Sequence, residues 1–244
     1  MARQSAPVIP VLVTRPQAEG EGFAAALVAR FGARVRPVLT PLMTPLYLRP
    51  TIPAKDYAGV MFTSAQAVEG ARRLGIPLPP LAWCVGRKTA SVAKAAGFQT
   101  ISADGNADAL VEAVLKSPPD GRMLYLRGVD TSGNILERIE DSGICVDDAI
   151  VYSQEPVPLT QDARLLLSTP GDLIVPLFSP RTASLFRSAL PARTLARLHI
   201  AAMSAGVAAA LDSLAPDSLV IAAHPDTPAM LAAVETLLVN LPAP

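Results

Sequence analysis

Hydrophobic positions along the chain follow strand spacing and helix spacing in turn. The apolar run Met123–Leu126 is rich in strand-forming residues, and Ile135, Leu136 and Ile139 then recur at helical spacing until Gly143. The next apolar run is AIVY, which leads into a proline-containing segment. This order of strand, loop, helix and strand predicts a parallel α/β structure.

The same pattern occurs near the N-terminus, which indicates an internal repeat. The run VLVT ends at Arg15, and Phe23, Leu27 and Val28 have helical spacing. Arg127 lies 112 positions after Arg15. Three strand–loop–helix units follow each copy, with loops at 62–67, 85–90 and 101–108 answered by 178–183, 203–208 and 221–228, at offsets of 116, 118 and 120. Because this period is far longer than that of solenoid repeats, it predicts two similar domains.

Two proline-rich segments divide the repeat. Proline fixes φ and lacks an amide donor, so the segments TPLMTPLYLRPTIP and SQEPVPLT favour extended linkers. We therefore predict an α/β protein of two flavodoxin-like parallel-sheet domains, joined by two extended linker strands, with a cleft between the domains. The expected bounds are 1–40 with 158–244 for domain 1, 54–150 for domain 2, and 41–53 and 151–157 for the linkers. The alternative, a plain tandem duplication, would place one boundary near Ser117.

Composition argues against several classes of protein. Half of the 244 residues are hydrophobic, and 21 Lys and Arg residues balance 21 Asp and Glu residues. A nucleic-acid-binding protein would show a clustered basic excess, which is missing here. No apolar run approaches the roughly 20 residues of a membrane helix, so no membrane association is expected. Cys84 and Cys145 have no metal-ligand spacing and are expected to be buried free thiols in a cytoplasmic protein.

Candidate binding residues follow the predicted strands. Ligands of open parallel sheets bind beyond the carboxyl ends of the strands, where free helix N-termini favour carboxylates or phosphates. We expect an anionic ligand there, held largely by backbone amides. The candidate residues are Arg15, Thr63, Ser64, Gly86, Arg87, Lys88, Thr89, Arg127, Ser179, Arg181 and Ser204. Alternatively, some of the polar residues at helix starts are caps only: Ser64, Thr89, Asn106 and Ser179.

Few side chains offer acid–base or nucleophilic chemistry. The chain lacks the motifs G-x-G-x-x-G, G-x-x-x-x-G-K-[ST], H-E-x-x-H and G-x-S-x-G, and no metal site is expected. His199 begins an apolar strand and is expected to be structural, whereas His224 has no nucleophile beside it. Tyr152 ends the run AIVY just before the second linker and is the candidate proton donor. Its alternative role is packing at the junction of the domains.

Taken together, these segments resemble uroporphyrinogen-III synthase, the fourth enzyme of tetrapyrrole synthesis, over about residues 8–238. The matching segments are VLVTRP, FTSAQAV, VGRKTA, DGNADALV, LYLRG, VY before a proline-containing linker, FSPRTASLF and PDTPAML. The resemblance implies two α/β domains joined by two crossing strands. It also implies cyclisation of hydroxymethylbilane to uroporphyrinogen III, with inversion of ring D, loss of water, and no cofactor or metal.

The resemblance also implies roles for single residues. The family's hydroxyl-assisting tyrosine, its substrate-contacting threonine and its helix-start serines correspond to Tyr152, Thr89, Ser64 and Ser179. Two positions depart from the family pattern: Val207 stands where threonine is frequent, and Gln66 where asparagine is common. We also expect a monomer, because the sequence shows no evident exposed apolar helix, and the resemblance implies that it takes hydroxymethylbilane from the upstream deaminase.

Two other classes of function stay open on the residues alone. Duplicated α/β halves with linkers also suit a two-domain solute-binding or sensory protein that closes on an anion without chemistry. The Ser- and Thr-rich helix starts also suit an enzyme acting on phosphosugars, although the sequence offers no base for that reaction.

Overall fold

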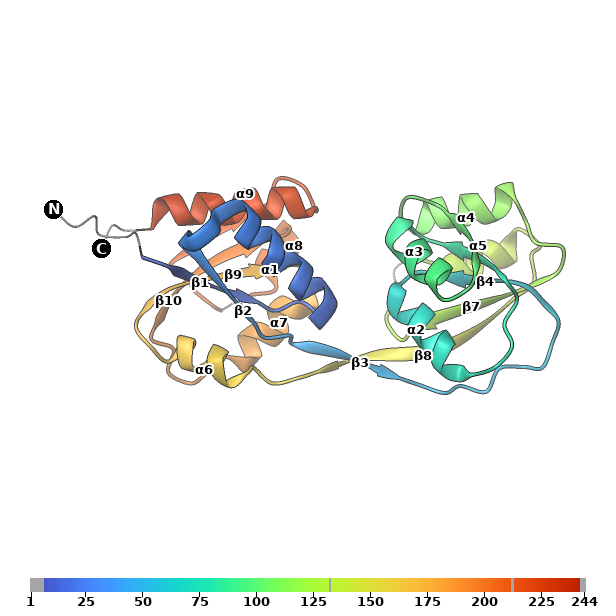
Figure 1. Cartoon of the computed structure of the whole chain (residues 1–244), viewed down its shortest axis with the longest axis horizontal. Helices are drawn as coiled ribbons and strands as arrows, with labels where there is room; N and C mark the ends of the chain where they lie inside the picture. Colours follow the sequence, from blue (N-terminus) through green and yellow to red (C-terminus); the bar gives the residue numbers. More distant parts are fainter. Residues whose placement is uncertain (1–6, 132, 212, 242–244) are drawn as a thin grey trace. The chain divides into compact units, whose positions relative to one another are not determined.

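The protein is described by a computed structural model that covers residues 7–131, 133–211 and 213–241. The chain divides into two compact units (Figure 1). Unit 1 comprises Met1–Thr44 and Pro156–Pro244, and unit 2 comprises Pro45–Glu155. No helix among the described residues is long and apolar enough to span a membrane.

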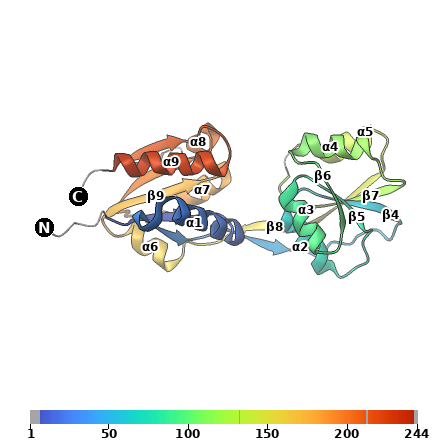
Figure 2. The ribbon, with the colours of Figure 1, turned by 45° about the horizontal axis from the view of Figure 1, so that its top comes forward.

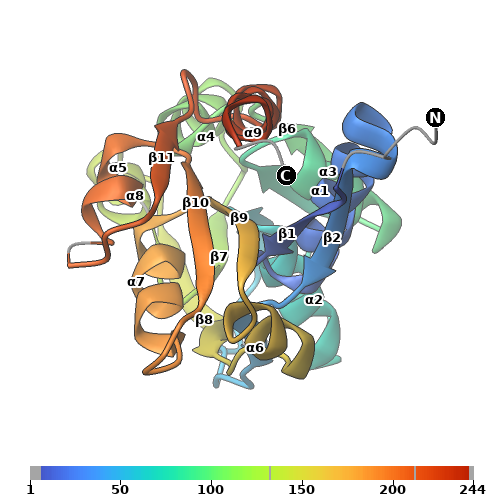
Figure 3. The same ribbon diagram turned by 90° about the vertical axis from the view of Figure 1, so that its left-hand side faces the viewer.

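Unit 1 contains a five-stranded parallel sheet in the order β11-β10-β9-β1-β2, which can be followed in Figure 3. Its strands are β1 (Ile9–Val13), β2 (Val35–Leu39), β9 (Gly171–Leu177), β10 (Ala196–Ala202) and β11 (Ser218–Ile221). Its helices are α1 (Gln17–Phe31), the short 3-10 helix η1 (Gly32–Arg34), α6 (Gln161–Leu167), α7 (Pro180–Ala189), α8 (Ala205–Ala209) and α9 (Thr227–Asn240).

The second sheet has six strands in the order β3-β8-β7-β4-β5-β6. The strands are β3 (Met43–Tyr47), β4 (Tyr57–Phe62), β5 (Leu81–Cys84), β6 (Gln99–Ser102), β7 (Arg122–Gly128) and β8 (Val146–Pro156). The helices of unit 2 are α2 (Ala65–Leu74), α3 (Arg87–Ala95), α4 (Ala107–Lys116) and α5 (Ile135–Asp141). Strands β4 to β8 are parallel. Two backbone hydrogen bonds show that β3 runs antiparallel to β8. Val157 N donates to Leu42 O at 3.0 Å, and Leu48 N donates to Val151 O at 2.9 Å.

The internal repeat accounts for the strand order of both sheets. Numbered along the segments of unit 1, the order is 2-1-3-4-5, which is the flavodoxin-like order. Unit 2 has the same order when β7 and β8 take the places of β1 and β2, and β4, β5 and β6 those of β9, β10 and β11. The first strand pair of each repeat therefore lies in one sheet with the last three strands of the other repeat. The predicted α/β fold with two parallel sheets is confirmed.

Helices cover both faces of each sheet. In unit 1, α1 and α9 pack on one face (Figure 2), and their residues Phe23, Leu27 and Met230 belong to one hydrophobic cluster. Helices α6, α7 and α8 pack on the other face around Phe186. In unit 2, α2 and α3 cover one face, and α4 and α5 cover the other, where Trp83 is 1% exposed. The helical spacing of the sequence predicts Phe23 and Leu27 on the buried face correctly, whereas Val28, expected with them, is 50% exposed.

Both predicted linkers contain strand structure. β3 lies within the first, 41–53, and β8 continues through most of the second, 151–157. Pro45 is tolerated in β3 because that strand lies at the edge of the sheet. Tyr152 therefore lies inside β8 and not at a strand end, so that part of the prediction was wrong. Pairing with β3 extends β8 beyond the apolar run AIVY, and this pairing leaves no local signal in the sequence.

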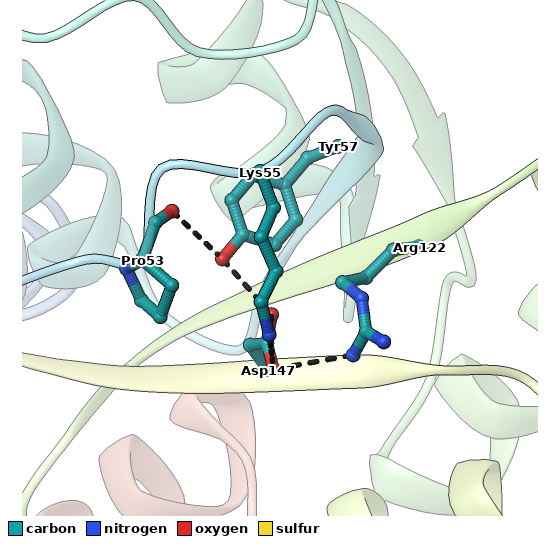
Figure 4. Close-up of polar contacts among 5 residues, drawn as sticks. All are labelled: Pro53, Lys55, Tyr57, Arg122 and Asp147. Atoms are coloured by element: carbon teal, nitrogen blue, oxygen red, sulfur yellow. Dashed lines mark hydrogen bonds and ion pairs between the residues drawn. The ribbon is translucent and has the colours of Figure 1, made fainter.

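At the amino ends of the strands of unit 2, the carboxylate of Asp147 forms hydrogen bonds with residues of the segment between β3 and β4 and with the start of β4 (Figure 4). Asp147 accepts hydrogen bonds from Lys55 Nζ at 3.0 Å, Tyr57 Oη at 3.0 Å and Arg122 Nη1 at 3.2 Å. Burial alone would raise the pKa of Asp147, but the hydrogen bonds from Lys55 and Tyr57 and the charge of Arg122 lower it. Burial and the hydrogen bond to Asp147 raise the pKa of Tyr57 to about 12.

Unit 1 has a comparable cluster at the amino ends of its strands. Asp172 accepts hydrogen bonds from Arg197 Nε and Nη2, both at 2.7 Å, and from His199 Nε2 at 2.9 Å. Ser218 Oγ lies 2.8 Å from His199 Nδ1. The hydrogen bonds from Arg197 lower the pKa of Asp172, and the one from His199 adds to the effect against the opposing influence of burial. His199, at 6% exposure, has the structural surroundings that its apolar strand predicts.

Candidate active site

Six of the loops at the carboxyl ends of the parallel strands, three in each unit, lead into helices whose capping residues correspond between the repeats. Helices α2, α3 and α4 begin after Ser64, Gly86 and Asn106, and α7, α8 and α9 begin after Ser179, Ser204 and Asp226. All of these capping residues except Gly86 accept a hydrogen bond from a backbone amide of the first turn. The caps thus satisfy part of each helix N-terminus and leave other amides of the first turn available to an anion.

The helix-capping residues of one repeat correspond in order to those of the other. Gly86 and Ser204 lie 118 positions apart, as the sequence pattern predicts, but Ser64 and Ser179 lie 115 positions apart and not 116. Phe178 therefore corresponds to Thr63 in the structure. The predicted offset was wrong because it matched two phenylalanines, whereas the helix starts fix the correspondence.

Tyr152 lies level with the carboxyl end of the neighbouring strand. It pairs with Gly128, the last residue of β7, and its carbonyl oxygen accepts from Val129 N at 3.0 Å. Its hydroxyl oxygen is 3.0 Å from Ser64 Oγ, and the residue is 9% exposed. A Cβ on residue 128 would lie 2.6 Å from Cζ of Tyr152, so only glycine lets the ring lie this close to the backbone. The phenol is thereby held beside the N-terminus of α2.

Two further tyrosines contact the same loop. Tyr125 Oη is 3.3 Å from Thr63 Oγ1, and burial is the main cause that raises the pKa of Tyr125. At 2% exposure, Tyr125 packs in the core. Tyr47 donates to Gln66 Oε1 at 2.6 Å, and the guanidinium of Arg73 lies 4.1 Å from the centre of the Tyr47 ring. Because Tyr47 occupies the amide oxygen, Gln66 keeps its NH₂ group for other partners at the first turn of α2.

The basic candidates differ in how far their charge is already compensated. In unit 2, Arg127 Nε lies 2.6 Å from Asp148, and Arg87 Nε lies 3.3 Å from Asp104. In unit 1, the guanidinium of Arg15 lies 4.3 Å from the centre of the Phe178 ring, and burial lowers the pKa of Arg15 while Glu19 opposes this. Lys88 and Arg181 are exposed in the first turns of α3 and α7.

Thr89 does not occupy the position that the sequence predicts for a helix cap. The cap of α3 is Gly86, and Thr89 lies in the first turn with 6% exposure. The corresponding residue of the other repeat, Val207, is 1% exposed and packs in the core of unit 1. The departure from threonine at Val207 therefore falls on a position that is buried in both units.

The remaining candidates are a possible metal site, the two cysteines and His224. No group of three or more His, Cys, Asp or Glu residues in the described part of the chain could hold a metal ion. Burial raises the pKa of the Cys84 thiol to about 11. Cys145, predicted to be buried, is exposed, because it lies in the turn between α5 and β8. His224 is exposed in the loop before α9.

Sequence reasoning missed three members of this site. Gly128 and Tyr47 were not among the candidate residues, and Gln66 was noted only as a departure from the family pattern. A glycine directly after the Arg that ends the run LYLR was the available signal for a close approach of another side chain. No local signal indicates the pairing of Tyr47 with Gln66, since their contact depends on β3 lying beside β8 and α2.

Comparison with known proteins adds a family match. The family model described as uroporphyrinogen-III synthase HemD matches residues 23–232, which are 210 of the 244 residues. Uroporphyrinogen-III synthetase from Helicobacter pylori 26695 matches in structure with a TM-score of 0.62 and 16% identity, over 95% of this chain and 100% of that chain. At this identity the likeness bears on the fold alone.

Other structural matches are weaker. A mutant uroporphyrinogen III synthase from the extremely thermophilic bacterium Thermus thermophilus matches with a TM-score of 0.47 and 17% identity, over 96% of this chain and 100% of that chain. The wild-type protein from the same organism matches with a TM-score of 0.37 and 17% identity, over 96% of this chain and 97% of that chain. No curated protein matches the chain significantly.

Proposed function

Since this chain belongs to the uroporphyrinogen-III synthase family and is a lyase that cyclises hydroxymethylbilane, we propose that Tyr152 is the acid that starts its reaction. The family match over residues 23–232 is the observation that supports this reaction. The choice of acid is supported by a phenol held beside the N-terminus of α2, with its oxygen 3.0 Å from Ser64. Of the two other tyrosines near this loop, Tyr125 is 2% exposed, and Tyr47 already donates its hydroxyl proton to Gln66 Oε1.

In the first step, Tyr152 donates its proton to the oxygen of the substrate's hydroxymethyl group. The C–O bond breaks, both of its electrons leave with the oxygen as water, and the adjacent pyrrole nitrogen supplies electrons to the carbon, giving an azafulvene. The pyrrole nitrogen loses its N–H proton, which returns to the Tyr152 phenolate, so the step releases one water and leaves the tyrosine neutral. Attack by the substituted carbon of ring D, fragmentation and reclosure then produce the inverted ring of uroporphyrinogen III.

Helix N-termini and basic residues bind the carboxylates of the substrate. In unit 2 the first turn of α3 contributes, with Gly86 at its cap and exposed Arg87 and Lys88 beside it. The other binding residues are Thr63, Thr89, Arg127, Arg15, Ser179, Arg181 and Ser204. Arg127 already contacts Asp148 at 2.6 Å, so it contributes mainly by keeping this edge of the sheet in place. Backbone amides supply most of the binding. This binding does not require a positively charged protein, and the formal net charge of this chain is zero.

Separation of the product isomers tests the function. Hydroxymethylbilane is generated in place, the protein is added, and the products are oxidised and resolved by chromatography. We expect the type III isomer to dominate, because the open tetrapyrrole closes unaided to type I and only the enzyme directs inversion. The control is the same mixture with heat-denatured protein. Type I alone, at the uncatalysed rate and with folded protein, would contradict the function.

We further propose that the enzyme is a cytoplasmic monomer that receives its small-molecule substrate from the deaminase that makes it. The balanced charge and the absence of any membrane-spanning helix among the described residues agree with this. Light scattering of the purified protein is expected to give a mass near 25.5 kDa. A mass of twice that value would contradict the monomer and leave the reaction unaffected.

A further inference from the structure

The hydroxyl of Ser64 has more contacts than capping a helix requires. Its Oγ lies 3.0 Å from the backbone nitrogen of Gln66, 3.3 Å from that of Ala67 and 3.0 Å from the hydroxyl oxygen of Tyr152. Both backbone nitrogens act only as donors, because an amide N–H has no lone pair to offer. Ser64 therefore accepts two hydrogen bonds at the first turn of α2.

Counting protons favours one direction for the third contact, with the Ala67 amide shared between Ser64 Oγ at 3.3 Å and the Ser64 carbonyl oxygen at 3.1 Å. A serine hydroxyl has two acceptor positions and one proton. With both acceptor positions taken by Gln66 and Ala67, the proton of Ser64 is what remains for Tyr152. Tyr152 therefore accepts this hydrogen bond, and its own phenolic proton is directed away from Ser64.

Resting on the proposed role of Tyr152, we infer that Ser64 is a positioning residue that holds the Tyr152 hydroxyl as a hydrogen-bond donor toward the substrate. Ser64 itself binds no carboxylate, because its single proton is already used. This differs from the expectation that Ser64 contacts the substrate. The close approach of the Tyr152 ring to Gly128, where a Cβ would lie 2.6 Å from Cζ, restricts the ring to the same orientation.

The same contact stabilises the charge that forms when the proton leaves. The phenolate oxygen of Tyr152 keeps the hydrogen bond from Ser64, and hydrogen bonds to an ionised acceptor are about twice as strong as neutral ones. Two amides at the positive end of α2 polarise the Ser64 hydroxyl in turn. Ser64 thus favours donation by Tyr152 in the transition state more than it favours binding of the substrate.

Three variants test this role in the isomer assay. Ser64→Gly removes the hydroxyl at little cost to the helix, since glycine costs only a few tenths of a kcal/mol at a cap. We expect kcat to fall about ten-fold with KM nearly unchanged, because one charge-assisted hydrogen bond is lost. Ser64→Thr keeps both the cap and the proton and is expected to retain kcat. Ser64→Gly combined with Tyr152→Phe is expected to be no slower than Tyr152→Phe alone.

The outcomes separate this inference from the proposed function. If Tyr152→Phe is slow and Ser64→Gly slows both backgrounds equally, Ser64 acts only as a cap; the inference is then wrong and the role of Tyr152 stands. A folded Ser64→Thr variant as slow as Ser64→Gly would also overturn it. If Tyr152→Phe turns over at the wild-type rate, the proposed acid is wrong and the inference fails with it. Thr160→Ala, which removes the cap of α6, controls for loss of a cap elsewhere.

Discussion

Tyr152→Phe is expected to lower kcat about 100-fold while the protein stays folded, since a positioned acid contributes about 10² to 10⁴ in rate. The substitution removes one oxygen atom and leaves the ring above Gly128. Departure of the hydroxyl would then depend on water as the proton source. Turnover of hydroxymethylbilane generated in place measures the loss, with the isomer ratio recorded in the same samples.

Tyr125→Phe is the matched control for this experiment. It removes a phenolic hydroxyl that contacts the same loop, 3.3 Å from Thr63 Oγ1, but Tyr125 is 2% exposed and cannot reach a substrate. We expect a stability change of about 1 kcal/mol, similar to that of Tyr152→Phe, and unchanged turnover. Equal rates for the two variants would remove Tyr152 from the mechanism.

Asp172→Asn is expected to lower the free energy of unfolding by about 2–3 kcal/mol, the largest stability effect we predict. The Asp172 side chain is 12% exposed and accepts hydrogen bonds from exposed Arg197 and from His199, which is 6% exposed. An amide offers one acceptor oxygen and leaves part of this network unpaired. Because Arg197 is 52% exposed, most of the expected loss comes from the buried contact with His199.

Urea unfolding followed by two signals measures this effect. Trp83, the only tryptophan, lies in unit 2, so its fluorescence follows that unit, whereas circular dichroism follows both. We expect the circular dichroism transition to shift to lower urea. Asp120→Asn removes the same charge at an exposed position and is expected to change stability by less than about 0.5 kcal/mol. Equal stability of wild type and Asp172→Asn would contradict the prediction.

The pH dependence of the Asp172→Asn effect has a definite sign. The hydrogen bonds from Arg197 lower the pKa of Asp172 in the folded state, so the carboxylate adds stability above its unfolded pKa of about 3.9. That contribution is lost as the pH falls below this value and through the folded pKa. The difference between wild type and variant is therefore expected to be constant near neutral pH and to shrink below about pH 4. An unchanged difference at low pH would point to a cause other than the carboxylate.

Much of the fold follows from local patterns in the sequence. The apolar spacing of Phe23 and Leu27 predicted α1, and Ser64, Asn106 and Ser179 predicted helix starts that the structure confirms as caps. These features are legible because their interactions join residues within four positions of one another. The repeat was legible for the same reason, since each copy carries its own strand, loop and helix signals.

Other features depend on residues far apart in the chain, and the sequence alone predicted them wrongly or not at all. β8 extends past Tyr152 only because β3, about 100 positions earlier, lies beside it. Thr89 and Val207 share a helix-start pattern with exposed neighbours, yet packing against the sheet buries both.

The sequence by itself therefore determined most of the elements other than β3 and the full length of β8, together with the α/β class and the family of this protein, because periodicity and caps are local. The tertiary structure alone decided that Ser64 contacts Tyr152, 88 positions away, that Gly128 admits the ring, and that Tyr47 occupies the amide oxygen of Gln66. Such contacts form only when strands that are distant in the sequence assemble into one sheet, and short-range sequence patterns do not indicate which strands become neighbours.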